Sequence, residues 1–332
     1  MKTKTSIRTT GVISLVALIL MGFNIPGLAQ AADLSYPERT VTLIVPYPPG
    51  GVTDLGARAF AAALEKHFKQ SVIVENKSGG ATTIAGNAVV KAKPDGYTLG
   101  FFPSSASIPE IYSYFYEAPY SSNDLLPVCK VLIPVLALAI KADSPWNSLK
   151  DFVEYARNNP GTKYGTHSRA TTGYLVMENI AKTEKLKLVD VPLGGDTKIV
   201  PTLMGGHVPI GTPGYPSIKS LVEAKQIKAL AMLTPKRADF APDVPTILEL
   251  GYDLNFVSQT YLGLFAPKGT PEEIIKKISE TAEKIASESD YKSRINNIGT
   301  QVSYEDTASF RESVGLYGKT LQEFFKEQGL VK

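Results

Sequence analysis

Residues 41–58 read Val-Thr-Leu-Ile-Val-Pro-Tyr-Pro-Pro-Gly-Gly-Val-Thr-Asp-Leu-Gly-Ala-Arg, and they decide the fold class. The apolar run Val41–Val45 predicts a buried strand, the Pro and Gly residues predict a turn, and a helix is predicted to open near Thr53 or Asp54. Such a helix leaves several backbone N–H groups unpaired at its start, with the positive end of the helix dipole behind them. The stretch therefore indicates either an anion-binding turn or an ordinary strand-to-helix connection of an α/β domain.

The first residues of the chain have the pattern of a secretory signal peptide. Lys2, Lys4 and Arg8 form a basic start, an apolar run follows at 12–23, and Ala29-Gln30-Ala31 offers a small-residue cleavage site. We therefore expect residues 1–31 to be removed on export, with cleavage near Ala31.

Removal of this segment changes the charge balance. The full chain has 35 Lys and Arg against 32 Asp and Glu, and without Lys2, Lys4 and Arg8 the two numbers are equal at 32. A near-neutral protein lacks the basic field that attracts nucleic acids, so no nucleic-acid partner is expected and an anion would bind through local geometry. Cys129 is the single cysteine, which excludes an intramolecular disulfide. The three His residues are scattered without carboxylate spacing, so neither a metal site nor a cofactor is predicted.

The chain reads as two similar α/β halves joined by extended crossings. Strands are predicted at 41–45, 72–74, 97–101, 163–165, 188–191, 208–211 and 227–233. Most of these strands end in loops rich in Gly, Ser, Thr or Pro, and in an open parallel sheet such loops gather at one edge, where ligands bind. Apolar segments at 125–140 and 261–266 are predicted to pass between the halves. Residues 102–107 are predicted to form a polar loop, and residues 243–251 a short helix that ends at glycine.

Enzyme signatures are missing from the pattern. The sequence has no Gly-x-Ser-x-Gly elbow and no Cys/His pairing, and Gly50-Gly51 is not followed by the Gly-Lys-Ser/Thr of a phosphate loop. A secreted hydrolase is therefore the weakest alternative, and a ligand-binding protein is the preferred hypothesis.

Several blocks, in order, resemble the receptors of tripartite tricarboxylate transporters, also called Bug proteins. The blocks are Val45–Asp54, Val74–Ala81, Lys93–Leu99, Val191–Gly195, Met204–Val208, Pro242–Thr246 and Gly263–Pro271. The resemblance implies an α/β, two-lobed periplasmic solute-binding protein of the type II, Venus-flytrap class, with two crossover strands. It also implies a monomer that captures a small organic carboxylate, aromatic acids included, by hinge closure without a cofactor. The protein would deliver its ligand to the large and small membrane subunits of a permease; the alternative is a sensor that signals to a membrane histidine kinase.

The resemblance places domain 1, which would clamp the carboxylate, at 32–136 plus 260–332. Domain 2, which would sort ligands, is placed at 137–259. The residues implied to contact the ligand in domain 1 are Tyr47, Pro49, Gly50, Gly51, Thr53, Asp54, Ser78, Gly80, Ala81, Thr82 and Ser104. In domain 2 they are Thr166, His167, Ser168, Arg169, Ala170, Thr171, Thr172, Gly194, Asp196, Pro213 and Tyr215.

Domain 2 departs from the family pattern at two loops. Bulky His167 and Arg169 stand where small residues are usual, and Pro192-Leu193-Gly194 lacks the usual aromatic and cationic pair. Arg169 is predicted to grip a second carboxylate of a dicarboxylate bidentately, so that Arg169→Ala would weaken binding by ~2 kcal/mol. The alternative for Arg169 is a solvated surface side chain.

Overall fold

The apolar strand β1 (Val41–Val45) pairs in parallel with two neighbours in the first of two sheets, where Leu43 lies opposite both Val74 and Leu99. This six-stranded sheet has the order β11-β4-β10-β3-β1-β2. Its other strands are β2 (Val72–Asn76), β3 (Thr98–Phe102), β4 (Leu125–Ile133), β10 (Leu262–Pro267) and β11 (Gln301–Glu305). The three strands that the sequence predicts in succession, β1, β2 and β3, are parallel to one another, and the sheet is mixed because β10 runs antiparallel to both β3 and β4.

The structure is a computed structural model that describes residues 1, 3, 35–169, 171–252 and 254–329. The predicted signal peptide lies almost wholly outside these residues, and so does Ala170. Met1–Ser35 forms a separate unit, and the following description concerns the unit Tyr36–Lys332.

The second sheet has five strands in the order β7-β6-β8-β5-β9. They are β5 (Ala137–Lys141), β6 (Thr162–Thr166), β7 (Leu188–Pro192), β8 (Ile210–Gly211) and β9 (Ile227–Met232). Strand β6 is parallel to β7 and β8, whereas β5 is antiparallel to β8 and β9. We call the six-stranded sheet with its helices the first lobe and the five-stranded sheet with its helices the second lobe.

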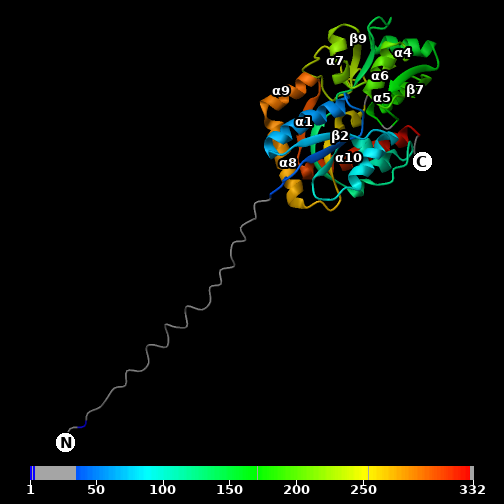
Figure 1. Ribbon diagram of the computed structural model, residues 1–332. Helices are drawn as coiled ribbons and strands as arrows, with labels where there is room; N and C mark the ends of the chain where they lie inside the picture. The colour runs from blue at the N-terminus through cyan, green and yellow to red at the C-terminus, as the bar shows by residue number, and fades with distance from the viewer. Residues whose placement is uncertain (2, 4–34, 170, 253, 330–332) are drawn as a thin grey trace. The chain divides into compact units, whose positions relative to one another are not determined.

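Helices flank both sheets, as Figure 1 shows. The first lobe has α1 (Val52–Phe68), α2 (Thr83–Val90), α3 (Ser104–Ser107), α8 (Glu272–Ser287), α9 (Ser289–Ile298) and α10 (Thr307–Glu327). The second lobe has α4 (Leu149–Asn158), α5 (Thr172–Thr183), α6 (Asp196–Met204) and α7 (Tyr215–Glu223). Helix α4 begins with a capping box in which Ser148 and Asp151 exchange hydrogen bonds with each other's backbone N–H.

Two connections join the lobes. Strand β4 of the first lobe is followed after 134–136 by β5 of the second, and the chain returns from β9 to β10 through 233–261. Val135 is fully buried, as expected for a crossing that runs through the interior. The predicted α/β, two-lobed architecture with two extended crossings is confirmed, whereas the exact domain boundaries stay a prediction.

Several local expectations fail. Residues 102–107 are not a polar loop, because Ser104–Ser107 form the short buried helix α3. Residues 243–251 form turns instead of a helix, although Thr246 and Glu249 exchange hydrogen bonds in the manner of a cap. Neither α9 nor β11 was predicted. In the part of the chain that the structure describes, no helix combines the length and apolar character needed to cross a membrane.

Candidate ligand-binding site

A pocket lies where the two lobes meet, at the ends of strands β1, β3, β6 and β7. Its volume is about 60 Å³ in this arrangement of the lobes, enough for a few water molecules. The lining residues are Tyr47, Pro48, Gly51, Val52, Thr53, Pro103, Ser104, Ser105, Pro134, Leu136, His167, Thr171, Thr172, Gly195, Asp196 and Leu262.

The turn between β1 and α1 is held by Asp54. Its carboxylate, almost fully buried, accepts hydrogen bonds from the N–H of Gly50 at 2.9 Å and from the side chains of Arg58 and Asn76. Asn76 also donates to the carbonyl of Tyr47. Gly50 has a φ of +90°, a conformation in which a side chain would be strained. Asp54 therefore fixes the shape of the turn, and it is not among the residues that line the pocket.

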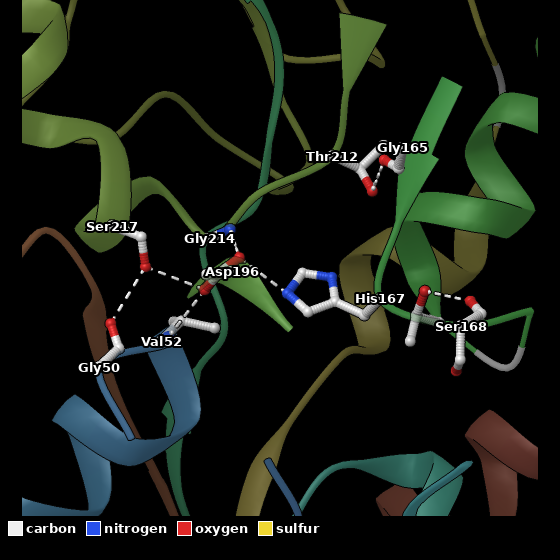
Figure 2. A network of polar contacts seen from close by, with 10 residues as sticks. Gly50, Val52, Gly165, His167, Ser168, Asp196, Thr212, Gly214 and Ser217 are labelled. Atoms are coloured by element: carbon white, nitrogen blue, oxygen red, sulfur yellow. Dashed lines mark hydrogen bonds and ion pairs between the residues drawn. The ribbon is translucent and has the colours of Figure 1, made fainter. Parts of the chain in front are cut away.

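The N-terminus of α1 holds a carboxylate, and this carboxylate belongs to the chain itself. The N–H of Val52, the first residue of α1, donates to Oδ2 of Asp196 at 3.2 Å. Asp196 is the first residue of α6 and comes from the second lobe. The anion-binding character predicted from residues 41–58 is thus expressed in the fold as an interlobe contact, which Figure 2 shows.

Three further groups surround Asp196. Oδ1 lies 2.8 Å from Nε2 of His167 and accepts the N–H of Gly214 at 2.8 Å. Oδ2 accepts the hydroxyl of Ser217 at 2.9 Å. Burial alone would raise the pKa of Asp196, but the charge and hydrogen bond of His167, together with Gly214 and Ser217, outweigh burial and hold this pKa below its usual value. Asp196 is therefore an anion at neutral pH.

Glycines allow the lobes to approach so closely. A Cβ added at Gly214 would lie 2.8 Å from Cβ of Val52, and one at Gly51 would lie 3.0 Å from Oδ2 of Asp196. A Cβ at Gly195 would meet the ring of Pro48 at 3.1 Å. Each of these contacts joins one lobe to the other, so glycine is required for the lobes to touch here.

The remaining walls combine hydroxyls with apolar surface. Tyr47 packs edge-on against His167, with ring centroids 5.8 Å apart, and burial raises the pKa of Tyr47 to about 12, so its hydroxyl stays protonated. Ser105 is 2 % exposed; its hydroxyl makes no well-formed hydrogen bond among the described residues, but it interacts with the hydroxyl of Tyr47 and opposes the rise in the pKa of that group. Ser104 shares a hydrogen bond of 2.6 Å with Tyr112. The pocket can therefore offer hydroxyl donors to a polar group.

The structure places eight of the predicted ligand residues in the lining: Tyr47, Gly51, Thr53, Ser104, His167, Thr171, Thr172 and Asp196. Others lie outside it: Pro49, Gly50, Asp54, Ser78, Gly80, Ala81, Thr82, Thr166, Ser168, Arg169, Gly194, Pro213 and Tyr215. Ala170 lies outside the described residues. The sequence does not single out Ser105, because 102–107 has the composition of a polar loop, nor Pro134, Leu136 and Leu262, because they lie in or beside apolar segments that predict only crossings between the lobes.

Arg169 does not enter the pocket. Its side chain is 60 % exposed, and Nε donates to Oδ2 of Asp190 at 3.2 Å. This hydrogen bond raises the pKa of Arg169, which stays a cation. The second grip expected from Arg169 is therefore not formed in this arrangement of the lobes, which instead places His167 beside Asp196.

Metal binding has no support in the described part of the chain, where no three His, Cys, Asp or Glu side chains gather to hold an ion. Cys129 is fully buried, and burial raises the pKa of its thiol, which is inert for this reason.

Two α/β lobes joined by two connections, with a pocket between them, define a two-lobed solute-binding protein. The chain belongs to the tripartite tricarboxylate transporter family receptors, whose family model matches residues 56–316. The predicted family is therefore confirmed. Solved structures that the chain resembles include a periplasmic transporter and the periplasmic binding protein BugD.

Individual relatives agree with this assignment. Protein BugT of Bordetella pertussis is 32 % identical over 263 residues, which cover 78 % of this chain and 80 % of BugT. The structure of R. palustris Rpa4515 with adipate has a TM-score of 0.81 at 28 % identity, covering 89 % of this chain and 98 % of that one. MatC from Rhodopseudomonas palustris with bound malate has a TM-score of 0.78 at 25 % identity, covering 87 % and 99 %.

Proposed function

We propose that the protein is exported to the periplasm and binds a small organic carboxylate in the pocket between its lobes. It then delivers this ligand to a permease made of one large and one small membrane subunit. The observation that carries the proposal is the carboxylate of Asp196 at the N-terminus of α1, because it demonstrates that this turn accommodates a carboxylate oxygen. The adipate and malate found with two structural relatives support the same ligand class.

The lobes work as a clamp in this proposal. The pocket takes side chains from both lobes, so a ligand that contacts both stabilises the arrangement in which they touch. The permease would recognise that arrangement. The connections at 134–136 and 258–262 are the natural hinge, since they are the points at which the chain passes between the sheets.

A thermal-shift screen of the purified protein tests the ligand class. Mono-, di- and tricarboxylates are compared with the corresponding uncharged amides, and a bound carboxylate is expected to raise the melting temperature. Gly51→Leu, which places a side chain beside Asp196 in the pocket, should abolish the shift. Gly315→Leu in α10, where an added Cβ meets nothing within 4 Å, is the matched control. Carboxylates that never raise the melting temperature would contradict the proposal.

Delivery is tested in cells. Deletion of the gene should abolish uptake of the carboxylate identified in the screen, while expression of the permease subunits is unchanged. Normal uptake with lost induction of the transport genes would instead support a sensor.

A further inference from the structure

We propose that Asp196 is a specificity-determining residue that restricts the ligand to a single carboxylate with an uncharged, largely apolar remainder. This inference rests on the proposed function and names the substrate class of the same pocket. It starts from the chemistry that the pocket already contains.

Asp196 is an anion built into the pocket. Its side chain is 2 % exposed, and four donors occupy its two oxygens: Val52, His167, Gly214 and Ser217. Because four donors leave its oxygens little capacity for a further hydrogen bond, Asp196 acts on a ligand mainly through its charge. It stays in place as a fixed negative charge.

The described residues that line the pocket offer no free positive charge to pair with a second ligand carboxylate. His167 is the one lining side chain among the described residues that can carry a positive charge, and its Nε2 is already directed at Asp196. A protonated His167 can at most offset Asp196. Arg169, the cation expected for the second grip, is bonded to Asp190 and exposed. A dicarboxylate would therefore bring one uncompensated charge into a poorly hydrated site next to Asp196.

One carboxylate, in contrast, has suitable partners. The backbone N–H groups of Thr53, at the second position of α1, and of Thr172, at the first position of α5, have no partner within their helices. Both residues line the pocket, so both helix dipoles favour an anion there. The buried hydroxyl of Ser105 also lines the pocket and makes no well-formed hydrogen bond among the described residues beyond its interaction with Tyr47, so it adds a donor independent of either helix.

The rest of the pocket suits an apolar group. Pro103, Pro134, Leu136 and Leu262 line it, and Leu136 and Leu262 are buried. A buried charged end would lose its hydration against these residues without gaining a counter-charge, whereas a hydrocarbon end would not. The pocket therefore distinguishes the two ends of its ligand.

Isothermal titration calorimetry with matched acids tests the inference. Hexanoate and adipate both have six carbons and differ only in that adipate has a second terminal carboxylate. Butyrate and succinate form the same kind of pair with four carbons. Of hexanoate and butyrate, we expect the one that binds the wild-type protein more tightly to bind at least tenfold more tightly than the dicarboxylate with the same number of carbons. Asp196→Asn keeps the size of the side chain but removes the charge, so the ratio should fall at least tenfold through improved dicarboxylate binding. Asp196→Ser, a smaller neutral side chain, should act in the same direction if Asp196→Asn folds poorly.

The control is Asp190→Asn, which removes a nearly buried carboxylate of the second lobe that does not line the pocket. It should leave the wild-type ratio unchanged. Tighter binding of the dicarboxylates by the wild-type protein, or an equal ratio in wild type and both Asp196 variants, would overturn the inference and leave the proposed carboxylate receptor standing. Failure of every acid to bind would overturn the proposed function, and the inference with it.

Discussion

The carboxylate of Asp196 lies 3.2 Å from the backbone nitrogen of Val52, although the two residues are 144 positions apart and belong to different lobes. The contact joins the start of α6 to the start of α1. Ser217 adds a second link, since its hydroxyl lies 2.9 Å from Asp196 and 3.3 Å from the carbonyl of Gly50. A small group of polar contacts thus holds the lobes together beside the pocket (Figure 2).

Low pH is expected to weaken the polar contacts that Asp196 makes between the lobes. The pKa of Asp196 lies below its usual value in the folded protein, so its charge contributes stability above pH ~4, the ordinary value of an unfolded Asp. This contribution is lost as the pH falls through the lower pKa of the folded state. His167 is the ionisable side chain that faces Asp196, with Nε2 2.8 Å from Oδ1. Melting temperatures measured from pH 6 to pH 3 should fall less in Asp196→Asn than in the wild-type protein. Asp290→Asn, an exposed acid in α9, should follow the wild-type profile, and superimposable curves for wild type and Asp196→Asn would refute the assignment.

A single methyl group at Gly214 should hold the lobes apart. Gly214 has a φ of −61°, so alanine fits its backbone, but the new Cβ would lie 2.8 Å from Cβ of Val52 in the other lobe. Because the new Cβ would also lie 2.8 Å from Oδ2 of Asp196 in its own lobe, we expect Gly214→Ala both to weaken carboxylate binding about tenfold and to lower the melting temperature. Calorimetry and thermal unfolding separate the two effects. Gly315→Ala is the control, and affinity equal to wild type in Gly214→Ala would show that the lobes do not meet here during binding.

Loss of Asp54 should damage the turn that forms one wall of the pocket. Asp54→Ala leaves the N–H of Gly50 and the side chains of Arg58 and Asn76 without their shared acceptor. The free energy of unfolding should fall by ~2 kcal/mol, the usual cost of removing one partner from a buried polar group. Urea unfolding measures the change, with Asp290→Ala as the exposed control. A change below about 0.5 kcal/mol would mean that the turn keeps its shape without Asp54.

Arg169 should contribute little to binding in this arrangement. Its guanidinium is mostly exposed and paired with Asp190, and such surface pairs are worth ~0–1 kcal/mol. We expect Arg169→Ala to change the calorimetric dissociation constant for hexanoate less than about threefold. Arg157→Ala, which removes a comparable exposed ion pair with Glu184, is the control and should change this dissociation constant just as little. A tenfold loss of hexanoate affinity in Arg169→Ala but not in Arg157→Ala would show that Arg169 contacts the ligand, as the sequence suggested.

The sequence predicts well where the signal is local. The apolar run of β1, the glycine turn after it and the capping box of Ser148 and Asp151 each depend on a few neighbouring residues, and each forms as expected. The helix α3 is missed because four small residues at 104–107 resemble a loop, and burial against the rest of the lobe decides their conformation.

Pairing between distant residues is not encoded in such local patterns. Asp196 was expected to contact the ligand because of the family resemblance, and Arg169 to grip it because it stands in a polar loop at the start of a helix. The structure instead pairs Asp196 with Val52 and Arg169 with Asp190. Which acid meets which donor depends on how two sheets are placed, and this placement becomes visible only in the fold.

The most direct test of the carboxylate site is the response of two backbone amides to a bound acid. In a ¹⁵N-labelled sample titrated with hexanoate, the amide proton signals of Thr53 and Thr172 should shift downfield and saturate together with the calorimetric binding curve. A carboxylate held at the starts of α1 and α5 requires this result. Saturable binding whose shifts avoid both amides and instead gather elsewhere, for example at 292–304, would contradict the account.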